Sequence, residues 1–186
     1  MRLVLASASP RRAELLSSAG FSFDVAAADV DETPHASEPP RVYALRVARD
    51  KARAISDRLA DAAILAADTV VVAGAHLLGK PANAADAARM LALLSGTTHL
   101  VQTAVVLRAG SQVFEDVAET RVEFCRLSSA EIDWYIGTGE HDGKAGAYAI
   151  QGRAARFVTS IEGSWSNVVG LPVATVYRML KGAGLT

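Results

Sequence analysis

Residues 3–12 read Leu3-Val4-Leu5-Ala6-Ser7-Ala8-Ser9-Pro10-Arg11-Arg12, and they join an apolar strand to the start of a helix. Free N–H groups at a helix start, the helix dipole and guanidinium groups all attract phosphate oxygens. Two hydroxyls and two guanidiniums stand at this junction, on Ser7, Ser9, Arg11 and Arg12. The stretch therefore predicts an anion cradle and points to a phosphorylated ligand.

The composition is that of an ordinary globular protein. Of 186 residues, 51% are hydrophobic and 21% are charged, so the chain is long enough to bury a sizeable core. Nineteen Lys and Arg residues against 20 Asp and Glu residues give a net charge of -1. This balance excludes the global positive field with which proteins recruit nucleic acid regardless of sequence.

The chain shows no pattern of a secreted or membrane protein. Its single cysteine, Cys125, excludes an intramolecular disulfide and fits a reducing compartment. The apolar run before Ala6-Ser7-Ala8 is shorter than the roughly 7–15 residues of a signal peptide core. The most apolar inner stretch, residues 62–79, is broken by Asp68 and His76. We therefore expect a cytoplasmic protein that binds neither nucleic acid nor membrane.

Hydrophobic periodicity and turn residues predict a mixed order of strands and helices. Helices are expected over 10–19, 41–59, 84–94, 128–136 and 172–183, and strands over 21–25, 64–72, 99–108 and 112–126. Ser9 is expected to cap the first helix and Gly20 to end it. The order favours an α/β or α+β architecture in one domain over residues 1–186, with no repeat and no long linker.

Acidic residues stand in two unusual places. Asp68 interrupts an apolar run, where a carboxylate is costly to bury unless it is paired, hydrogen-bonded or bound to metal. An aspartate that accepts a backbone N–H at a strand end is the equal alternative. Asp31 and Glu32 lie in a loop before Pro34 and are typical of a solvated loop. Together with Asp68, they could supply the oxygen ligands that Mg²⁺ shares with substrate phosphates.

Two lysines are candidates for phosphate binding, each with an ordinary alternative. Lys51 flanks the apolar face of the helix expected over 41–59, and most such lysines extend their ammonium group to water. Lys80 stands in the sharp turn Gly79-Lys80-Pro81 and could direct a compact charge at a phosphate. Without further support, Lys80 is more typical of an ordinary surface lysine.

The segment 139–152 is rich in glycine and contains Lys144 and Gln151. Glycines allow the backbone to approach a ligand closely, and the Gln151 amide offers both a donor and an acceptor to a nucleobase edge. A flexible surface turn leading into a strand is the alternative. The spacing matches neither a Walker loop nor the dinucleotide-binding glycine pattern.

Taken together, segments along nearly the whole chain resemble the Maf family, whose characterised members are nucleoside triphosphate pyrophosphatases. The matching segments are Ser7-Ala8-Ser9-Pro10-Arg11-Arg12, Asp31-Glu32, Lys51-Ala52, Ala67-Asp68-Thr69-Val70-Val71, Gly79-Lys80-Pro81, Leu94-Ser95-Gly96 with His99, residues 144–152, and Asn167-Val168-Val169-Gly170-Leu171-Pro172. The resemblance implies an α/β Maf or ITPase-like fold. This fold is a mixed twisted sheet flanked by helices, with a central cleft that two lobes of the single domain can border.

The resemblance also implies an activity. The family members cleave a nucleoside triphosphate between its α- and β-phosphates, releasing the monophosphate and pyrophosphate, with a divalent cation such as Mg²⁺ or Mn²⁺. The resemblance further implies a homodimer and a role in removing modified pyrimidine nucleotides. A nucleotide-binding regulator of septum formation with little catalysis is the alternative from another class, and a phosphotransferase is disfavoured because no Walker loop is present.

Roles carry over residue by residue. Asp68 matches the proposed catalytic base and, with Glu32, a metal ligand, while Lys51 and Lys80 match catalytic cations in the cluster around the metal and the phosphates. The substrate-binding positions of the family match Ser7, Ser9, Arg11, Arg12, Thr69, Lys144 and Gln151. Among these, Arg11, Thr69 and Gln151 fit the subfamily that prefers dTTP and UTP, whereas the sister subfamily that acts on 7-methyl-GTP has different residues at these positions.

Overall fold

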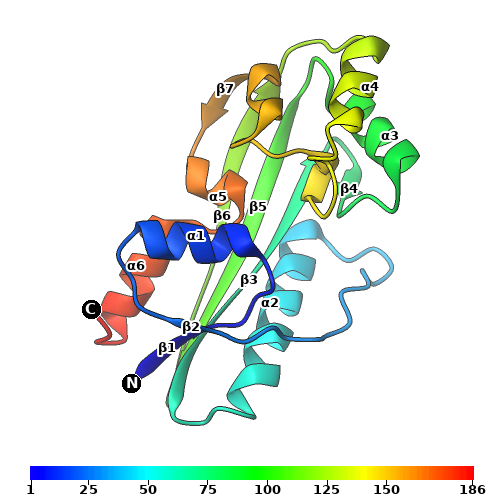
Figure 1. Ribbon diagram of the computed structural model, residues 1–186. Coiled ribbons are helices and arrows are strands. Elements are labelled where there is room, and N and C mark those ends of the chain that lie inside the picture. Colours follow the sequence, from blue (N-terminus) through cyan, green and yellow to red (C-terminus); the bar gives the residue numbers. More distant parts are fainter. The chain divides into compact units, whose positions relative to one another are not determined.

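The computed structural model describes all 186 residues and contains a mixed sheet flanked by helices, as expected for an α/β protein (Figure 1). The strands are β1 (Arg2–Leu5), β2 (Asp24–Val25), β3 (Ala62–Ala73), β4 (His76–Leu78), β5 (Thr98–Ala109), β6 (Gln112–Phe124) and β7 (Val158–Glu162). The helices are α1 (Pro10–Ser18), α2 (Pro40–Ser56), α3 (Ala84–Leu94), α4 (Ser129–Gly137), η1 (Ala145–Ala147), η2 (Arg153–Phe157), α5 (Trp165–Val169) and α6 (Val173–Gly182). No helix is long and apolar enough to cross a membrane.

The sheet has seven strands in the order β2-β1-β3-β5-β6-β7, and β4 pairs with β3 outside this path. β1 runs parallel to both β2 and β3, whereas β4 is antiparallel to β3 and β7 is antiparallel to β6. Parallel neighbours need a long crossover, which the chain supplies as α1 between β1 and β2 and as α2 before β3. The sheet is therefore mixed, as the resemblance implied.

The chain forms two compact units. The first comprises residues 1–68, 103–118 and 170–186, and the second comprises residues 69–102 and 119–169. Strands β3, β5 and β6 each contribute residues to both units. A single domain with lobes around a cleft stays a prediction.

In the first unit, successive side chains of β3 point to opposite faces of the sheet, and both faces are buried. Ala63, Leu65 and Ala67 belong to one apolar cluster with residues of β1, β5, α1 and α6, including Leu5, Leu107, Leu16 and Val176. The intervening Ile64 and Ala66 are also buried and point to the opposite face. Helix α2 buries a stripe that includes Val47, Ala48, Ala52 and Ile55, none of which belongs to that cluster, so we assign α2 to this second face (Figure 1).

The acidic loop that follows β2 is held against α2. The Arg46 guanidinium donates to both Glu38 carboxylate oxygens, at 2.8 and 2.9 Å, and to the Thr33 carbonyl at 3.0 Å. The Tyr43 hydroxyl donates to the Glu32 carbonyl at 2.7 Å. These bonds hold the backbone at Glu32 and at the residue that follows it.

The second unit has an aromatic core. His99, Phe124 and Tyr148 stack edge to face with ring centroids 4.9–5.4 Å apart, and Phe157 lies 6.2 Å from Phe124. Burial lowers the pKa of His99 to about 4, so its ring is neutral at pH 7. The ring nitrogen Nε2 lies 2.8 Å from the Tyr148 hydroxyl, which fixes Tyr148 at the centre of the unit.

One glycine in this unit is required by close packing. Gly146 has a φ of 69°, and a Cβ at this position would lie 2.9 Å from Val71 Cγ2. Its N–H donates to the Gly79 carbonyl at 3.0 Å. The absence of a side chain at Gly146 therefore lets the segment 139–152 pack directly onto β3 and the turn that contains Lys80.

Most predicted elements are confirmed, but several details differ. The Ser9 side chain makes no cap hydrogen bond, and instead the Ser9 N–H donates to Ser7 Oγ at 3.2 Å. The strand expected over 21–25 is reduced to the two residues of β2. Strand β7 and helix α5 were not predicted, because β7 is largely exposed and α5 is only five residues long. Ser128 and Glu131 form the capping box typical of a helix start.

The Arg46–Glu38 contact predicts a specific acid sensitivity. Hydrogen bonds from Arg46 lower the pKa of Glu38 from its ordinary value of 4.5 to about 2. A lowered pKa stabilises the fold above pH 4.5, and this contribution is lost as the pH falls towards 2. We expect Glu38→Gln to flatten the fall of the unfolding free energy between these pH values, measured by denaturant titration. Glu14→Gln on the exposed side of α1 is the control, and equal flattening in both variants would contradict the interpretation.

The packing at Gly146 predicts a loss of stability when a methyl group is added. Gly146→Ala combines left-handed backbone strain with overpacking against Val71 and should cost about 2–4 kcal/mol. Gly143→Ala is the matched control because Gly143 has a similar φ of 64° but open space around its Cβ position. It should cost only about 1–2 kcal/mol. Thermal unfolding of the two variants measures the difference, and equal losses would show that the Val71 contact contributes nothing.

Candidate active site

The centre of the candidate site is a buried lysine held between two carboxylates. Lys51 Nζ lies 2.8 Å from Asp68 Oδ1 and 2.7 Å from Glu32 Oε1. Lys51 and Asp68 are buried, whereas 37% of the Glu32 side chain is exposed. The group therefore opens to solvent on the side of Glu32.

Helix and strand periodicity explain why these side chains meet. Asp68 lies two and four residues after Ala66 and Ile64, so it extends from the face of β3 that we assign to α2. Lys51 lies four residues after Val47 on α2, which places it on the buried side of that helix. The third member, Glu32, is brought in by the loop that Tyr43 and Arg46 hold.

The structure decides between the alternatives for three acidic and basic residues. Asp68 is an ion-paired buried carboxylate rather than a strand-end residue capping a backbone N–H. The expectation that Lys51 extends to water is wrong, because Asp68 and Glu32 balance its charge in the interior. Asp31 is exposed, and its Oδ1 accepts the Thr33 N–H at 2.8 Å. Hydrogen bonds from the Thr33 side chain and then from its N–H lower the pKa of Asp31. The structure groups Glu32 with Asp68 and leaves Asp31 in a turn.

The cradle at the start of α1 is joined to the same strand. The buried Arg12 guanidinium donates from Nε to the Gly170 carbonyl at 2.8 Å and from Nη1 to the Ala67 carbonyl at 2.7 Å. Nη1 also donates to Ser7 Oγ at 3.2 Å. Arg12 therefore binds the residue just before Asp68 and fixes the loop that contains Ser7 and Ser9.

The electrostatics link this cradle to the lysine group. Burial lowers the pKa of Arg12, while the negative charges of Asp68 and Glu32 oppose that shift and the positive charge of Arg11 adds to it. Arg11 is itself half-buried, and burial lowers its pKa as well. The first unit thus gathers three cations and two carboxylates with serine hydroxyls. Such a set can bind a phosphate chain and accept a proton from water.

The remaining predicted residues lie in the second unit. Thr69 begins that unit and is partly buried, and Lys80 and Gln151 are exposed. Lys144 Nζ donates to the Asp142 carbonyl at 2.8 Å. The bond from Gly146 to Gly79 brings the segment with Lys144 beside the turn with Lys80. Residues 146–150 are buried and lead into η2, so a surface turn followed by a strand is wrong for this segment.

The carboxylates of the site fit a divalent cation only together with a phosphorylated ligand. The structure contains no group of three or more His, Cys, Asp or Glu side chains arranged to hold a metal ion. Mg²⁺, however, commonly takes only one or two protein carboxylates and completes its shell with water and substrate phosphates. Glu32 and Asp68, which meet at Lys51 Nζ, are two such carboxylates, so the donors fit Mg²⁺ or Mn²⁺ in the presence of a phosphorylated ligand.

Tyr43 is a site residue that the sequence analysis missed. It lies eight residues before Lys51 on α2, so the two side chains share one face of the helix. Burial raises the pKa of Tyr43 to about 12, and the charges of Asp68 and Glu32 add to this effect. The hydroxyl therefore stays protonated and keeps donating to the Glu32 carbonyl. The helical spacing of Tyr43 and Lys51 is the signal that could have found it.

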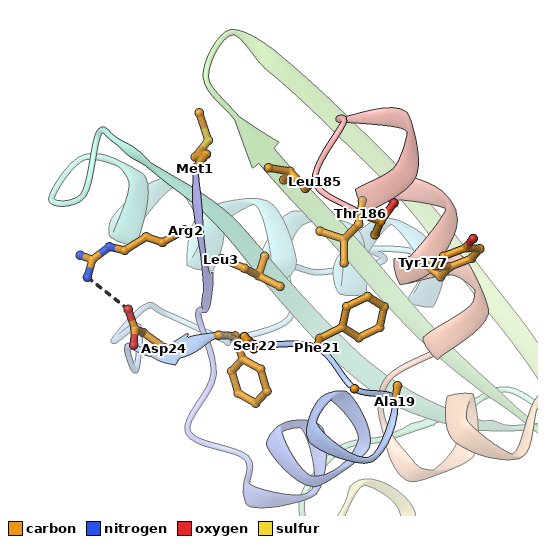
Figure 2. Close-up of a pocket in the computed structure, with 13 residues that line it drawn as sticks. Met1, Arg2, Leu3, Ala19, Phe21, Ser22, Asp24, Tyr177, Leu185 and Thr186 are labelled. Atoms are coloured by element: carbon orange, nitrogen blue, oxygen red, sulfur yellow. Dashed lines mark hydrogen bonds and ion pairs between the residues drawn. The ribbon is translucent and has the colours of Figure 1, made fainter.

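A pocket of about 780 Å³ lies elsewhere in the first unit (Figure 2). Its lining includes Phe21, Tyr177 and Leu185, and the exposed ion pair of Arg2 with Asp24, at 3.1 Å, is among the lining residues drawn. None of the residues predicted to bind substrate lines it. Its lining is mainly apolar, so it lacks the convergent cations that a triphosphate needs.

Comparison with known proteins identifies the family. The family model described as Maf-like protein matches residues 2–183. A dTTP/UTP pyrophosphatase of Anaeromyxobacter dehalogenans is 54% identical over 187 residues, covering 98% of this chain and 94% of that protein. Proteins of the same name from Koribacter versatilis and Shewanella frigidimarina are 52% and 48% identical, and they cover 100% and 97% of this chain and 96% of their own length. The resemblance seen in the sequence motifs is confirmed, and the chain belongs to the Maf family.

Proposed function

We propose that this protein hydrolyses nucleoside triphosphates, preferably dTTP and UTP, to the monophosphate and pyrophosphate. The names of relatives that share about half of their residues with this chain support the activity. The observation that carries the proposal is the buried Lys51, ion-paired at once with Asp68 and Glu32. The Lys51 ammonium group can stabilise negative charge on a phosphate, and the neighbouring Asp68 can activate water. The cradle at the start of α1, which includes Arg12, can bind the phosphate chain.

The proposed reaction assigns a role to each group of the first unit. Asp68 accepts a proton from water, and the water oxygen bonds to the α-phosphorus while the bond to the bridging oxygen of the β-phosphate breaks. Pyrophosphate leaves with the electron pair of that bond. Lys51, Arg11 and Arg12 neutralise charge that develops on the phosphate oxygens, and they act best because their positions are fixed in advance. Ser7 and Ser9 donate to the phosphate oxygens.

A divalent cation belongs to the proposal. Mg²⁺ or Mn²⁺ would be held by Glu32 and Asp68, and it supplies charge neutralisation and lowers the pKa of water when bound. In the second unit, we propose that Lys80 and Lys144 bind phosphate and that Thr69 and Gln151 bind the base. These roles rest on the family resemblance, as does a homodimer. A role in removing modified pyrimidine nucleotides follows from the proposed substrate class, and the single cysteine supports a cytoplasmic location. A regulator of cell division with little catalysis is the competing outcome of the tests below.

Removal of the Asp68 charge should abolish most of the activity. With Mg²⁺ and a panel of triphosphates, Asp68→Asn should lower kcat for dTTP and UTP about 10²–10⁴-fold, because the amide cannot accept the proton. Pyrophosphate release measures the rate. Asp116→Asn is the matched control, since Asp116 is also an aspartate of the first unit, ion-paired with Arg178 at 3.5 Å. If Asp68→Asn is as active as the parent, or if dTTP and UTP survive the parent protein, the proposed mechanism is wrong.

The position of attack can be tested separately with heavy-oxygen water. Attack at the α-phosphorus places the water oxygen in the monophosphate and none of it in the pyrophosphate. Mass spectrometry of the products after turnover of dTTP distinguishes the two. Label found in pyrophosphate would demonstrate attack at the β-phosphorus and would contradict the proposed reaction while leaving hydrolysis itself established.

A further inference from the structure

The Glu140 carboxylate lies directly against a glycine next to Gln151. Its Oε2 accepts the Arg153 N–H at 2.7 Å, and its Oε1 lies 3.7 Å from Arg153 Nη1. A Cβ added to Gly152 would lie 2.2 Å from Glu140 Oε2, well inside van der Waals contact. The φ of Gly152 is -105°, which any residue adopts, so the obstacle to a side chain here is the Glu140 carboxylate, which an added Cβ would displace.

This contact joins the two ends of the segment that contains Gln151. Glu140 stands just after α4, where its own N–H donates to Thr138 Oγ1 at 3.2 Å. Through Arg153, it holds a residue 13 positions further along the chain. The carboxylate therefore ties the exit of the segment to the end of α4.

The backbone of Gln151 is held from both sides. On one side, the Ala149 N–H donates to the buried Tyr135 hydroxyl at 3.0 Å. The Gly152 N–H donates to the Ala149 carbonyl at 3.0 Å, and this bond closes a turn that contains Gln151. On the other side, Glu140 holds Arg153. The Gln151 side chain is exposed, so its direction depends on how firmly this turn is held.

We propose that Glu140 is a positioning residue that fixes the turn of Gln151 and thereby sets the discrimination between nucleobases. The proposal rests on the proposed function, in which the Gln151 amide binds the base. The Gln151 amide can recognise a base only if it lies within hydrogen-bond distance of the base edge, and a displaced amide loses that bond. Loss of one such bond corresponds to about a three- to tenfold change in discrimination.

The test compares bases rather than overall rates. The ratio of kcat/KM for dTTP to kcat/KM for dCTP is measured in the parent protein and in Glu140→Ala. We expect the ratio to fall about three- to tenfold, because the turn loses its anchor at Arg153. Glu140→Gln should restore part of the ratio, since its amide oxygen can still accept the Arg153 N–H. Gly152→Ala should lower the ratio as Glu140→Ala does, because its methyl group displaces the carboxylate that remains.

A matched control removes a different carboxylate of the same unit. Glu162 is exposed on β7 and is ion-paired with Arg121 at 3.2 Å. Glu162→Ala should leave the ratio unchanged. An equal fall in Glu162→Ala and Glu140→Ala would overturn the proposal, because the effect would then follow from any lost ion pair.

A double-variant cycle separates positioning from a merely structural role. If Glu140 acts through Gln151, Glu140→Ala causes no further fall of the ratio in a protein that already carries Gln151→Ala. A structural role would lower activity on both bases equally and would add to the effect of Gln151→Ala. An unchanged ratio in Glu140→Ala and Glu140→Gln, with a parent that discriminates, overturns this inference alone. A parent that hydrolyses neither nucleotide overturns the proposed function as well.

Discussion

The buried ammonium group of Lys51 is the interaction on which the first unit depends. A charge in the interior is costly unless partners surround it, and here Asp68 and Glu32 lie within 2.8 Å of Lys51 Nζ. Removing one partner of a buried pair typically costs about 3–5 kcal/mol, because the other charge stays behind. A buried group of charges of this kind contributes less to the free energy of folding than apolar side chains of the same volume would. Its retention in the core is therefore better explained by a task that needs charge, as catalysis on phosphates does.

The fold was largely predictable from the sequence because local patterns and tertiary packing agree. Helix α3 and the hairpin of β5 and β6 have the expected bounds within a residue or two, since Asn83, Gly96 and Gly110 end or cap them as turn chemistry requires. Strand β7 was not predicted, because its mostly exposed residues show no buried stripe and only its pairing with β6 makes it a strand. The expected side-chain cap of Ser9 is absent, and Ser7 Oγ instead accepts hydrogen bonds from the Ser9 N–H and from Arg12 in that turn.

The site was less predictable, because its charges are defined by partners far apart in the chain. Lys51 looked like a surface lysine since one helix face cannot show that Asp68, 17 residues later, balances its charge. Asp31 and Glu32 are neighbours of equal charge, and the contacts that distinguish them come from residues distant in the chain. Lys51 pairs with Glu32, and Tyr43 and Arg46 hold the loop. The family motifs identified these positions as a set, whereas periodicity alone left each of them with an ordinary alternative.

In the second unit, closely packed glycines help to hold the candidate site residues in position, as ion pairs do in the first unit. Gly146 and Gly152 each stand where a side-chain atom of another residue lies close to the position of a Cβ, Val71 in one case and Glu140 in the other. Both glycines lie within the segment 139–152, which contains Lys144 and Gln151, and at each of them an added Cβ would force its neighbour to move. A segment rich in glycine is usually flexible, but here each close approach is accompanied by a hydrogen bond, from Gly146 to Gly79 or from Arg153 to Glu140. The glycines therefore serve to hold exposed polar side chains on a firmly anchored backbone, which is what selective binding of a small ligand requires.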